Sequence, residues 1–326
     1  MLEEVPPGAD LPTSWATSSP LHDPGRLWPQ TNCNLDLWIE YFHHRGLPAE
    51  AVLSVLVEIT DEGDQMTFSK IDNADIAALF GLEVRELAIF DRLDHHIAMQ
   101  TARGNMVMVE VDGFHLPDTR ATSYQRLHTK TTIGVDVIDP AARQLCYFHN
   151  CGHYELAGTD YVAVLELELP DRISGERLFP YTEFVKPMRA ALSGAALREA
   201  AVAALRQHLG KAPAENPFVS YQARFAADLA MLAGRDPEYF HIYAFNHFRQ
   251  FGAGFELLGS FARWLAEPGG DTLIRHCDQI AAAAKLLQFR VARATARRRI
   301  DPCDQIFAEL TSHWDGAFDW MRRTFG

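Results

Sequence analysis

Apolar residues recur at helical spacing in a short segment near the start of the chain. The spacing predicts a helix from Cys33 to His44, because its apolar side chains all fall on one face. Thr31 or Asn32 stands where a capping residue belongs, and Gly46 stands where the helix would end. The apolar residues of that face are Leu35, Trp38, Ile39 and Phe42.

The chain that follows mixes helical and strand patterns. The patterns favour helices near 49–59, 72–80 and 92–103, and strands at 83–90 and 106–112. A β-hairpin comes next, with arms at 131–138 and 145–150 around a turn at 139–143. We therefore expect an α+β fold with an antiparallel sheet in this half of the chain.

After about residue 190 the pattern becomes helical throughout and predicts an all-α bundle. Three helices are expected to begin with a capping Asn or Asp followed by Pro: at Asn216-Pro217, Asp236-Pro237 and Asp301-Pro302. One long aromatic helix is expected over 240–266. Three segments result: a proline-rich arm over 1–30 that packs over another part or stays mobile, an α+β domain over 31–185, and a helical domain over 186–326.

Composition narrows the function classes. The chain of 326 residues has 43 Asp and Glu against 30 Lys and Arg, a formal charge of −13, which argues against nucleic acid as the main partner. No stretch approaches about 18 uncharged apolar residues, and the acidic first residues do not resemble a signal peptide. We expect a cytoplasmic protein that does not bind membranes. The five cysteines are odd in number and widely spread, which favours reduced thiols over a disulfide framework.

Cys33 falls in the first turn of its expected helix. Backbone N–H groups at a helix N-terminus stabilise negative charge on a thiolate, and they can also donate to an oxyanion formed when sulfur attacks a carbonyl. The position therefore suits a nucleophile in acyl transfer. The alternative is that Cys33 only packs, as most free cysteines do.

His128 and Asn150 flank the expected hairpin and could complete a catalytic group. The order Cys, His, Asn matches the papain-type arrangement of nucleophile, base and orienting amide. If Ile138 pairs with Gln144 across the turn, His128 and Asn150 project from the same face of the sheet. A register shifted by one residue would offer His149 instead, with Asp136 or Asp139 behind it. The alternative is that His128 is a polar residue at the start of a strand and Asn150 a turn residue.

Three further groups of residues give weaker evidence for a functional site. Cys146, His149, Cys151 and His153 are metal-ligand types, but alternation along a strand sends Cys146 and His149 to opposite faces, so we expect no metal site. The loop Gly63-Asp64-Gln65 could reach an active site or simply turn the chain. A basic stripe suits a phosphate or an acidic partner helix, or is a solvated face; it comprises Arg290, Arg293, Arg297, Arg298 and Arg299.

Several strings resemble the bacterial family of domain of unknown function 1839. They are QTNCNLDLWIEYFHHRGL, EGDQMTFSK, VEVDGFHLPDT, HTKTTIGVDVIDPAARQLCYFHN and FNHFRQFGAGFELLGSFARWL, and they cover nearly the whole chain. More remotely, the layout is similar to the papain-like butirosin biosynthesis acyltransferase, with an early Cys, a VD-x-aromatic segment, a His-led strand and a helical C-terminal region. The resemblance places the nucleophile at Cys33, the base at His128 and the third role near Asn150.

This resemblance implies an activity and a set of partners. The expected function is transfer of an aminoacyl or acyl group from the phosphopantetheine thioester of an acyl or peptidyl carrier protein, through a thioester on Cys33. The phosphopantetheine arm would be substrate, with no bound cofactor, and an amino acid:carrier protein ligase would be a further partner. Arg290, Arg293 and Arg297 would receive the carrier protein. The residues expected to bind substrate are Gln30, Asn32, Asp64, Gln65 and Asp112.

Two other functions stay open at this point. The same residues would suit a papain-like hydrolase, whether peptidase, amidase or thioesterase. A module that binds carrier protein without catalysis is the second alternative. The sequence departs from the family at Gln30, where Glu is expected before Thr-Asn-Cys. A Gln there could donate to an oxyanion, although it lies only three residues before the nucleophile.

Overall fold

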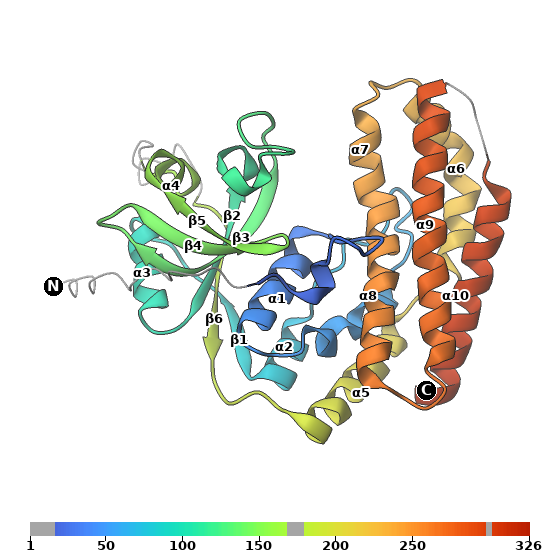
Figure 1. Cartoon of the computed structure of the whole chain (residues 1–326), viewed down its shortest axis with the longest axis horizontal. Coiled ribbons are helices and arrows are strands. Elements are labelled where there is room, and N and C mark those ends of the chain that lie inside the picture. Colours follow the sequence, from blue (N-terminus) through green and yellow to red (C-terminus); the bar gives the residue numbers. More distant parts are fainter. Residues whose placement is uncertain (1–16, 168–178, 298–301) are drawn as a thin grey trace. The chain divides into compact units, whose positions relative to one another are not determined.

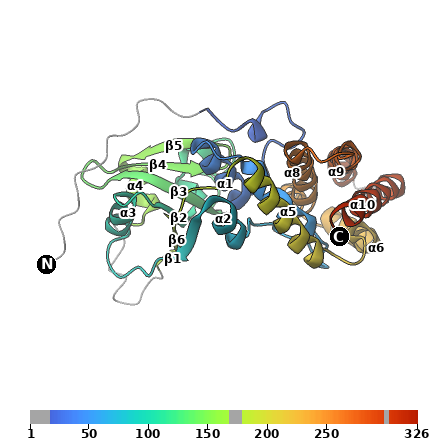
Figure 2. The same ribbon diagram turned by 90° about the horizontal axis from the view of Figure 1, so that it is seen from below.

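A computed structural model describes residues 17–167, 179–297 and 302–326. The contacts divide them into two units, which are drawn in Figures 1 and 2. Unit 1 comprises residues 17–19, Asp36–Leu47 and the described part of Ile76–Ala191. Unit 2 comprises Pro20–Leu35, Pro48–Asp75 and the described part of Leu192–Gly326. Two segments that precede the sheet in the sequence therefore pack with the C-terminal helices.

Unit 1 is built on a six-stranded sheet with strand order β1-β6-β2-β3-β4-β5, in which every neighbouring pair is antiparallel. Four consecutive residues of β2 and five of β4 are buried, so both faces of the sheet are covered along these strands. Their bounds are β1 Leu82–Glu86, β2 Met106–Asp112, β3 Lys130–Asp139, β4 Gln144–His149, β5 Gly152–Ala157 and β6 Thr182–Pro187.

The two faces of this sheet are covered by different helices. Leu37 of α1 approaches the sheet at Gly134, where an added Cβ would lie 3.3 Å from the leucine Cδ2. The opposite face is a hydrophobic cluster in which Ile97 of α3 packs with Ile133 and Val135. The helical elements of this part of the chain are α1 Cys33–His44, α2 Asn73–Phe80, α3 Leu93–Thr101, η3 Gly113–His115, η4 Pro117–Thr119 and α4 Gly158–Val164.

The β3–β4 hairpin departs from the expected register. The turn is where the sequence places it, but Ile138 pairs with Leu145 rather than with Gln144. The register then shifts between Val135 and Val137, so Asp136 is an extra residue on β3. The expectation from alternation was therefore wrong at the turn. It could not include the bulge, because a one-residue insertion leaves no mark in a short hydrophobic pattern.

Other strand predictions were partly correct. β2 occupies 106–112 as expected, whereas β1 ends at Glu86 rather than at residue 90. β5 and β6 were not anticipated. Both lie at positions where the apolar alternation is short or interrupted, and pairing with neighbouring strands supplies the missing order.

Within the described residues of unit 2 the regular elements are all helices, and the one β-bridge joins Asp61 to Met66 in loop 60–67. Figures 1 and 2 show α8, α9, α10 and α6 running side by side in this unit. The earlier segment η2, a 3₁₀ helix, packs against α5 and α8. The elements are η1 Pro20–His22, η2 Ala49–Glu58, α5 Gly194–Lys211, α6 Pro217–Ala233, α7 Tyr239–Ala244, the π-turn η6 Phe245–Arg249, α8 Gln250–Leu265, α9 Asp271–Arg297 and α10 Asp304–Phe325.

Of the three helices expected to begin with an Asn-Pro or Asp-Pro pair, α6 begins at the expected residue, and α7 and α10 begin two residues after their prolines. Asn216 caps α6 through its side chain, which accepts from the N–H of Phe218, and Pro217 is the first helical residue. After Asp236-Pro237 the chain makes a turn, and α7 begins only at Tyr239. The expectation that Pro302 would start a helix was wrong, because α10 begins at Asp304 after a left-handed Cys303, which keeps Pro302 outside the helix. Asp301 lies outside the described residues.

The long aromatic helix expected over 240–266 forms as a continuous helical path from Tyr239 to Leu265, but it contains an unexpected π-helical segment. α7 and α8 are joined by the π-turn Phe245–Arg249, in which one extra residue is accommodated within a helical path, and α8 ends at Leu265. Periodicity alone could not reveal the turn, because its aromatic residues continue the apolar stripe.

The end of the expected N-terminal arm packs in unit 2. Trp28 is buried, its indole N–H donates to the Ala281 carbonyl at 3.0 Å, and its backbone N–H donates to Glu256 at 2.9 Å. The Lys285 ammonium lies 3.5 Å from the centre of the Trp28 ring. Residues 1–16 of the arm lie outside the described residues.

The fold class is α+β, with an antiparallel sheet in the N-terminal half followed by a helical region, as expected. Among the described residues, every helix is too short or too polar to traverse a lipid bilayer.

His208 connects three segments of unit 2. Its Nδ1 lies 2.6 Å from Glu58 of η2, and its Nε2 lies 2.6 Å from Asp75. Burial lowers the pKa of His208, but the hydrogen bonds and charges of Asp75 and Glu58 outweigh it and raise that pKa above its ordinary value. Lys211 also approaches Glu58, at 3.6 Å.

We expect His208→Gln to lower the free energy of unfolding by about 1.5–3 kcal/mol in mildly acidic buffer, because a buried charged hydrogen-bonding group is lost. The folded-state pKa is raised, so this stabilisation is fully present below the unfolded pKa and disappears as pH rises through the folded pKa. Urea unfolding of both proteins from about pH 5 to about pH 9 measures the difference. His241→Gln, which removes an exposed imidazole, is the control. A difference independent of pH would contradict the prediction.

Candidate functional site

Cys33 is the first residue of α1 and is half-buried, with a reduced thiol. The capping prediction is confirmed at Asn32, whose side-chain oxygen accepts from the backbone N–H groups of Asn34 and Leu35, each at 3.1 Å. Those two N–H groups are therefore already paired. The expectation that the first turn offers its N–H groups to an oxyanion is therefore wrong for Asn34 and Leu35. Asn32 does not cap the N–H of Cys33.

Asn32 also ties the helix start to the rest of unit 2. Its side-chain NH₂ donates to the Ser69 carbonyl at 3.0 Å and to the side-chain oxygen of Gln250 at 3.2 Å. The next asparagine, Asn34, accepts from the N–H of Ile71 at 3.2 Å. The position of Cys33 is thus set by the chain segment 69–71 and by the first residue of α8. Gln30, expected to bind substrate, is half-buried in the same unit.

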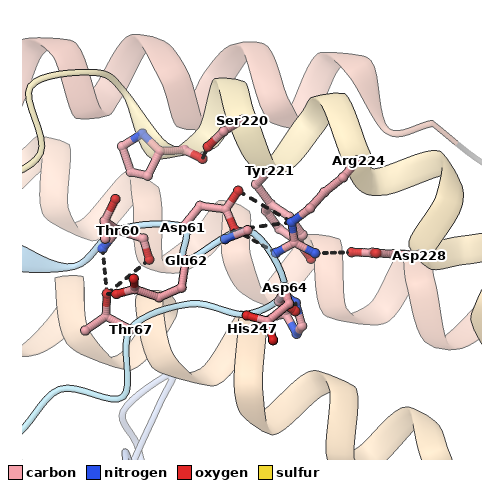
Figure 3. Close-up of polar contacts among 12 residues, drawn as sticks. Thr60, Asp61, Glu62, Asp64, Thr67, Ser220, Tyr221, Arg224, Asp228 and His247 are labelled. Carbon is pink, nitrogen blue, oxygen red and sulfur yellow. Dashed lines mark hydrogen bonds and ion pairs between the residues drawn. The ribbon is translucent and has the colours of Figure 1, made fainter.

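The loop 60–67 contains Asp64 and Gln65, both expected to bind substrate. Figure 3 shows this loop held against α6, with Arg224 between the carboxylates of Asp61 and Asp228. The Arg224 Nη2–Asp61 distance is 2.8 Å, and the Asp61 side chain is 1% exposed. Asp64 and Gln65 themselves are exposed at the loop tip.

The same loop is attached to the π-turn. The His247 Nε2 lies 3.1 Å from the Asp64 carbonyl (Figure 3). Its Nδ1 lies 2.9 Å from the Tyr243 carbonyl. The Met66 N–H donates to the Asn246 carbonyl at 3.1 Å. Burial lowers the pKa of His247. The π-turn therefore supplies contacts to loop 60–67 through two of its residues, and Gln250 directly after it contacts Asn32.

His128 belongs to unit 1, just before β3. Its Nδ1 lies 2.5 Å from Asp112 Oδ2, and its ring stacks on Phe114 with a centroid distance of 4.4 Å and an angle of 11°. The imidazole is 73% exposed. Because an ionised carboxylate only accepts hydrogen bonds, Nδ1 donates to Asp112, and in the neutral imidazole Nε2 is the nitrogen left to accept a proton.

Asp112 ends β2 and is positioned by the backbone. Its Oδ1 accepts from the N–H groups of Phe114 at 3.0 Å and Thr129 at 3.1 Å, while Oδ2 contacts His128. Burial would raise the pKa of Asp112, but the hydrogen bonds from His128, Phe114 and Thr129 hold it below its ordinary value. The carboxylate is therefore ionised and oriented. The sequence argument placed Asp112 with substrate and did not connect it with His128.

Asn150 and the alternatives to it have other neighbours. Asn150 lies in the β4–β5 turn with a left-handed φ of 46°, and its amide lies 3.3 Å from His149. His149 is buried between Asp118 at 2.6 Å and Thr131 at 2.7 Å. Asp136 contacts His153, and Asp139 accepts from the backbone of its own turn. Of the residues considered for the third role, none of these contacts His128 within the described structure.

The cysteine and histidine cluster of the hairpin separates in the structure. His149 contacts Asp118 and His153 contacts Asp136, while the Cys146 thiol is buried and its pKa is raised to about 12 by burial and by the nearby Asp136 and Glu155. The described residues contain no group of three or more His, Cys, Asp or Glu side chains arranged to hold a metal ion.

The basic stripe lies on α9. Arg290, Arg293 and Arg297 are exposed, and their spacing of three and four residues puts them on one side of the helix. Leu286 and Phe289, one turn earlier, are 45% and 65% exposed. Arg298 and Arg299 lie outside the described residues.

The predicted catalytic residues fall in different units: Cys33 in unit 2, His128 and Asn150 in unit 1. The structure brings His128 together with Asp112, and their combined action with Cys33 stays a prediction. Sequence reasoning missed the Asp112–His128 contact and the stacking of Phe114. Pairing β2 with β3 would have found both, because Asp112 lies opposite Lys130 in that ladder.

Sequence comparison gives two matches along the chain. A model of the DUF1839 N-terminal domain matches residues 17–187, and a model of the DUF1839 C-terminal domain matches residues 194–323. No curated protein matches the chain.

We expect Arg224→Met to lower the free energy of unfolding by about 3–5 kcal/mol, because it leaves the buried carboxylate of Asp61 without its cation. Arg263→Met is the matched control, since the Arg263–Asp278 pair is 46% and 44% exposed and its loss should cost less than about 1 kcal/mol. Urea titrations of the three proteins compare the two pairs. Equal losses for the buried and the exposed pair would show that the prediction is wrong.

Proposed function

The chain belongs to the DUF1839 family, and with that membership as the premise we propose that it is a cysteine-dependent acyltransferase. In this proposal Cys33 is the nucleophile, His128 the general base and Asp112 the residue that orients His128. The observation that carries the proposal is the contact between Asp112 and the Nδ1 of an exposed His128. Asp112 replaces Asn150 in the third role because it is the group that contacts this imidazole.

The His128 pair has the features of a base in acyl transfer. Asp112 fixes the tautomer and stabilises the imidazolium that forms when His128 accepts a proton. Stacking on Phe114 limits rotation of the ring, so less orientation entropy is lost when substrate binds. The high exposure of His128 leaves Nε2 accessible to a reacting group, which a buried imidazole would not offer.

The proposed reaction has two steps of the same kind. His128 takes the proton of the Cys33 thiol, and the sulfur attacks the carbonyl of the donor thioester to form a tetrahedral oxyanion. The oxyanion collapses, the bond to the donor sulfur breaks, and that sulfur leaves as a thiol with the proton from His128. An acceptor amine then attacks the Cys33 thioester, loses its proton to His128, and Cys33 leaves and is reprotonated.

The proposed donor is the phosphopantetheine thioester of an acyl or peptidyl carrier protein. Exchange between two thioesters is nearly isoenergetic, so the enzyme needs mainly to stabilise the oxyanion and exclude water. Gln30 stays a proposed oxyanion donor, and Asp64 and Gln65 stay proposed substrate contacts. An amino acid:carrier protein ligase is the proposed source of the loaded carrier.

We expect incubation with an aminoacylated carrier protein to give an adduct of the mass of the aminoacyl group, visible by intact-mass spectrometry. Cys33→Ala should abolish this adduct. Cys151→Ala is the matched control, because Cys151 is the other half-buried thiol and the remaining three are buried. An adduct that persists in Cys33→Ala would contradict the assignment of the nucleophile.

The same assay tests the base. His128→Gln should slow formation of the adduct by roughly 10²- to 10⁴-fold, and Asp112→Asn should slow it by roughly tenfold or more. His95→Gln is the control, because His95 forms a partly exposed pair with Asp91 in the same unit. An unchanged rate in His128→Gln would remove that residue from the mechanism.

The fate of the acyl group separates transfer from hydrolysis. A mass gain on an added amine supports the transferase, whereas release of free acid at the same rate with and without amine supports the papain-like hydrolase. Carrier binding without any adduct or turnover supports the non-catalytic module and overturns the proposal.

Arg290, Arg293 and Arg297 are the proposed docking site for the acidic carrier protein. Their shared helix side and the neighbouring exposed Phe289 provide charge together with apolar area. We expect Arg293→Glu to weaken carrier binding by about two- to fivefold at low salt, with a smaller effect at high salt. Titration calorimetry measures both, and Arg323→Glu on α10 is the matched charge reversal. Equal weakening by the two variants would argue against this site.

A further inference from the structure

Unit 1 contains a small polar pocket that the proposed acyl transfer does not use. It is formed by the last turn of α1, the residues that lead into β2, and the bulge of β3, and its volume is about 200 Å³. This is the volume of about six or seven water molecules, at about 30 Å³ each. The pocket is lined by Tyr41, His44, Arg45, Gly104, Asn105, Met106 and Asp136.

One wall of the pocket carries a carboxylate. Asp136 is the bulged residue of β3, and bulges redirect side chains that regular pleating would place elsewhere. Its Oδ1 lies 2.9 Å from His153 Nε2, and the imidazole is almost completely buried. The His153 ring stacks on Phe148 with a centroid distance of 4.3 Å. The contact with buried His153 therefore holds the Asp136 side chain in place, and that side chain remains 20% exposed.

Tyr41 also lines the pocket and is 3% exposed. Within the described residues its hydroxyl makes no hydrogen bond of normal geometry, and the Arg45 guanidinium is the polar group that interacts with it. Burial raises the pKa of Tyr41 above its ordinary value, so the hydroxyl stays protonated and can donate. A buried hydroxyl without an acceptor is unfavourable, and a ligand carboxylate in the pocket would supply that acceptor.

Arg45 adds a positive charge to the Tyr41 wall. It follows Tyr41 by four residues, which places both on one side of the chain at the end of α1, and its guanidinium lies 5.5 Å from the centre of the Tyr41 ring. Across the described part of the chain, Arg45 forms no ion pair with a carboxylate. His44 also lines the pocket, and burial together with the nearby His153 lowers its pKa, so at neutral pH it adds no charge.

The two walls have opposite charges. A simple anion would meet Asp136, and a simple cation would meet Arg45, so neither is complementary to the whole pocket. We propose that this pocket binds a small zwitterion of the α-amino acid class, with its carboxylate at Arg45 and the Tyr41 hydroxyl and its ammonium at Asp136. The volume suits a ligand of about six non-hydrogen atoms, such as alanine.

This inference is independent of the proposed function, because none of its residues is assigned to the acyl transfer. The side-chain amide of Asn105 donates to Gln100 at 2.9 Å, and this hydrogen bond fixes the residues that precede β2. The pocket would therefore be formed before the ligand arrives, as small-molecule sites usually are.

Saturation-transfer NMR and titration calorimetry with glycine, alanine and serine test the proposal. We expect alanine to bind the wild-type protein, and acetate or ethylamine, which carry one charge each, to bind at least tenfold more weakly. Tyr41→Phe should weaken alanine binding by about two- to tenfold. Arg45→Met and Asp136→Asn should weaken it by about tenfold or more, because each removes a charged partner.

Two control variants in the same unit match these changes. Tyr124→Phe removes a hydroxyl that contacts Asp160, and Arg143→Met removes an exposed cation; neither should alter alanine binding. Tyr41→Phe removes a single hydroxyl, and Arg45→Met replaces an exposed side chain that forms no ion pair within the described residues, so both should fold, which circular dichroism verifies. The proposal is overturned if no amino acid binds at millimolar concentration, if acetate binds as tightly as alanine, or if all three pocket variants bind alanine as the wild type does.

Discussion

The side chain of Asn32 fixes where α1 begins and therefore where Cys33 lies within unit 2. One amide caps two N–H groups of the first turn and also donates to Ser69 and to Gln250. A helix that began one residue earlier or later would lose all four contacts at once, because they converge on one side chain. The segment 69–71, loop 60–67 and the π-turn before α8 are positioned relative to one another through this side chain and through His247.

Histidine–carboxylate contacts recur in the molecule, and burial separates their roles. The His149–Asp118 and His208–Asp75 contacts involve side chains that are almost wholly buried, so their protons cannot reach a substrate and their effect is structural. His128 makes a contact of similar length with Asp112 but remains mostly exposed. The same pair of residue types thus holds segments together in one place and leaves a ring nitrogen accessible to solvent in another. Exposure of the imidazole, rather than the presence of the pair, is the evidence for chemistry.

The sequence predicted features that depend on local signals. The bounds of α1, a cap at Thr31 or Asn32, and the cap at Asn216 were predicted because a capping side chain and the first helical turn are neighbours in the chain. The hairpin register and the π-turn were not found, because each adds one residue that only tertiary packing can accommodate. The partner of His128 was missed for a related reason. Asp112 is sixteen residues away and reaches His128 through the pairing of β2 with β3.

Asn150 shows why residue type and chain order are weak evidence for a catalytic role. Its φ of 46° lies in the left-handed region, which Asn adopts more readily than most residues, so the tight β4–β5 turn alone accounts for an asparagine there. Asp112 is different, since its carboxylate is held by two backbone N–H groups and still presents one oxygen to an exposed imidazole. The backbone conformation of the turn is sufficient to explain why an asparagine stands at position 150. A carboxylate that is oriented toward an exposed imidazole has a property that backbone geometry does not require.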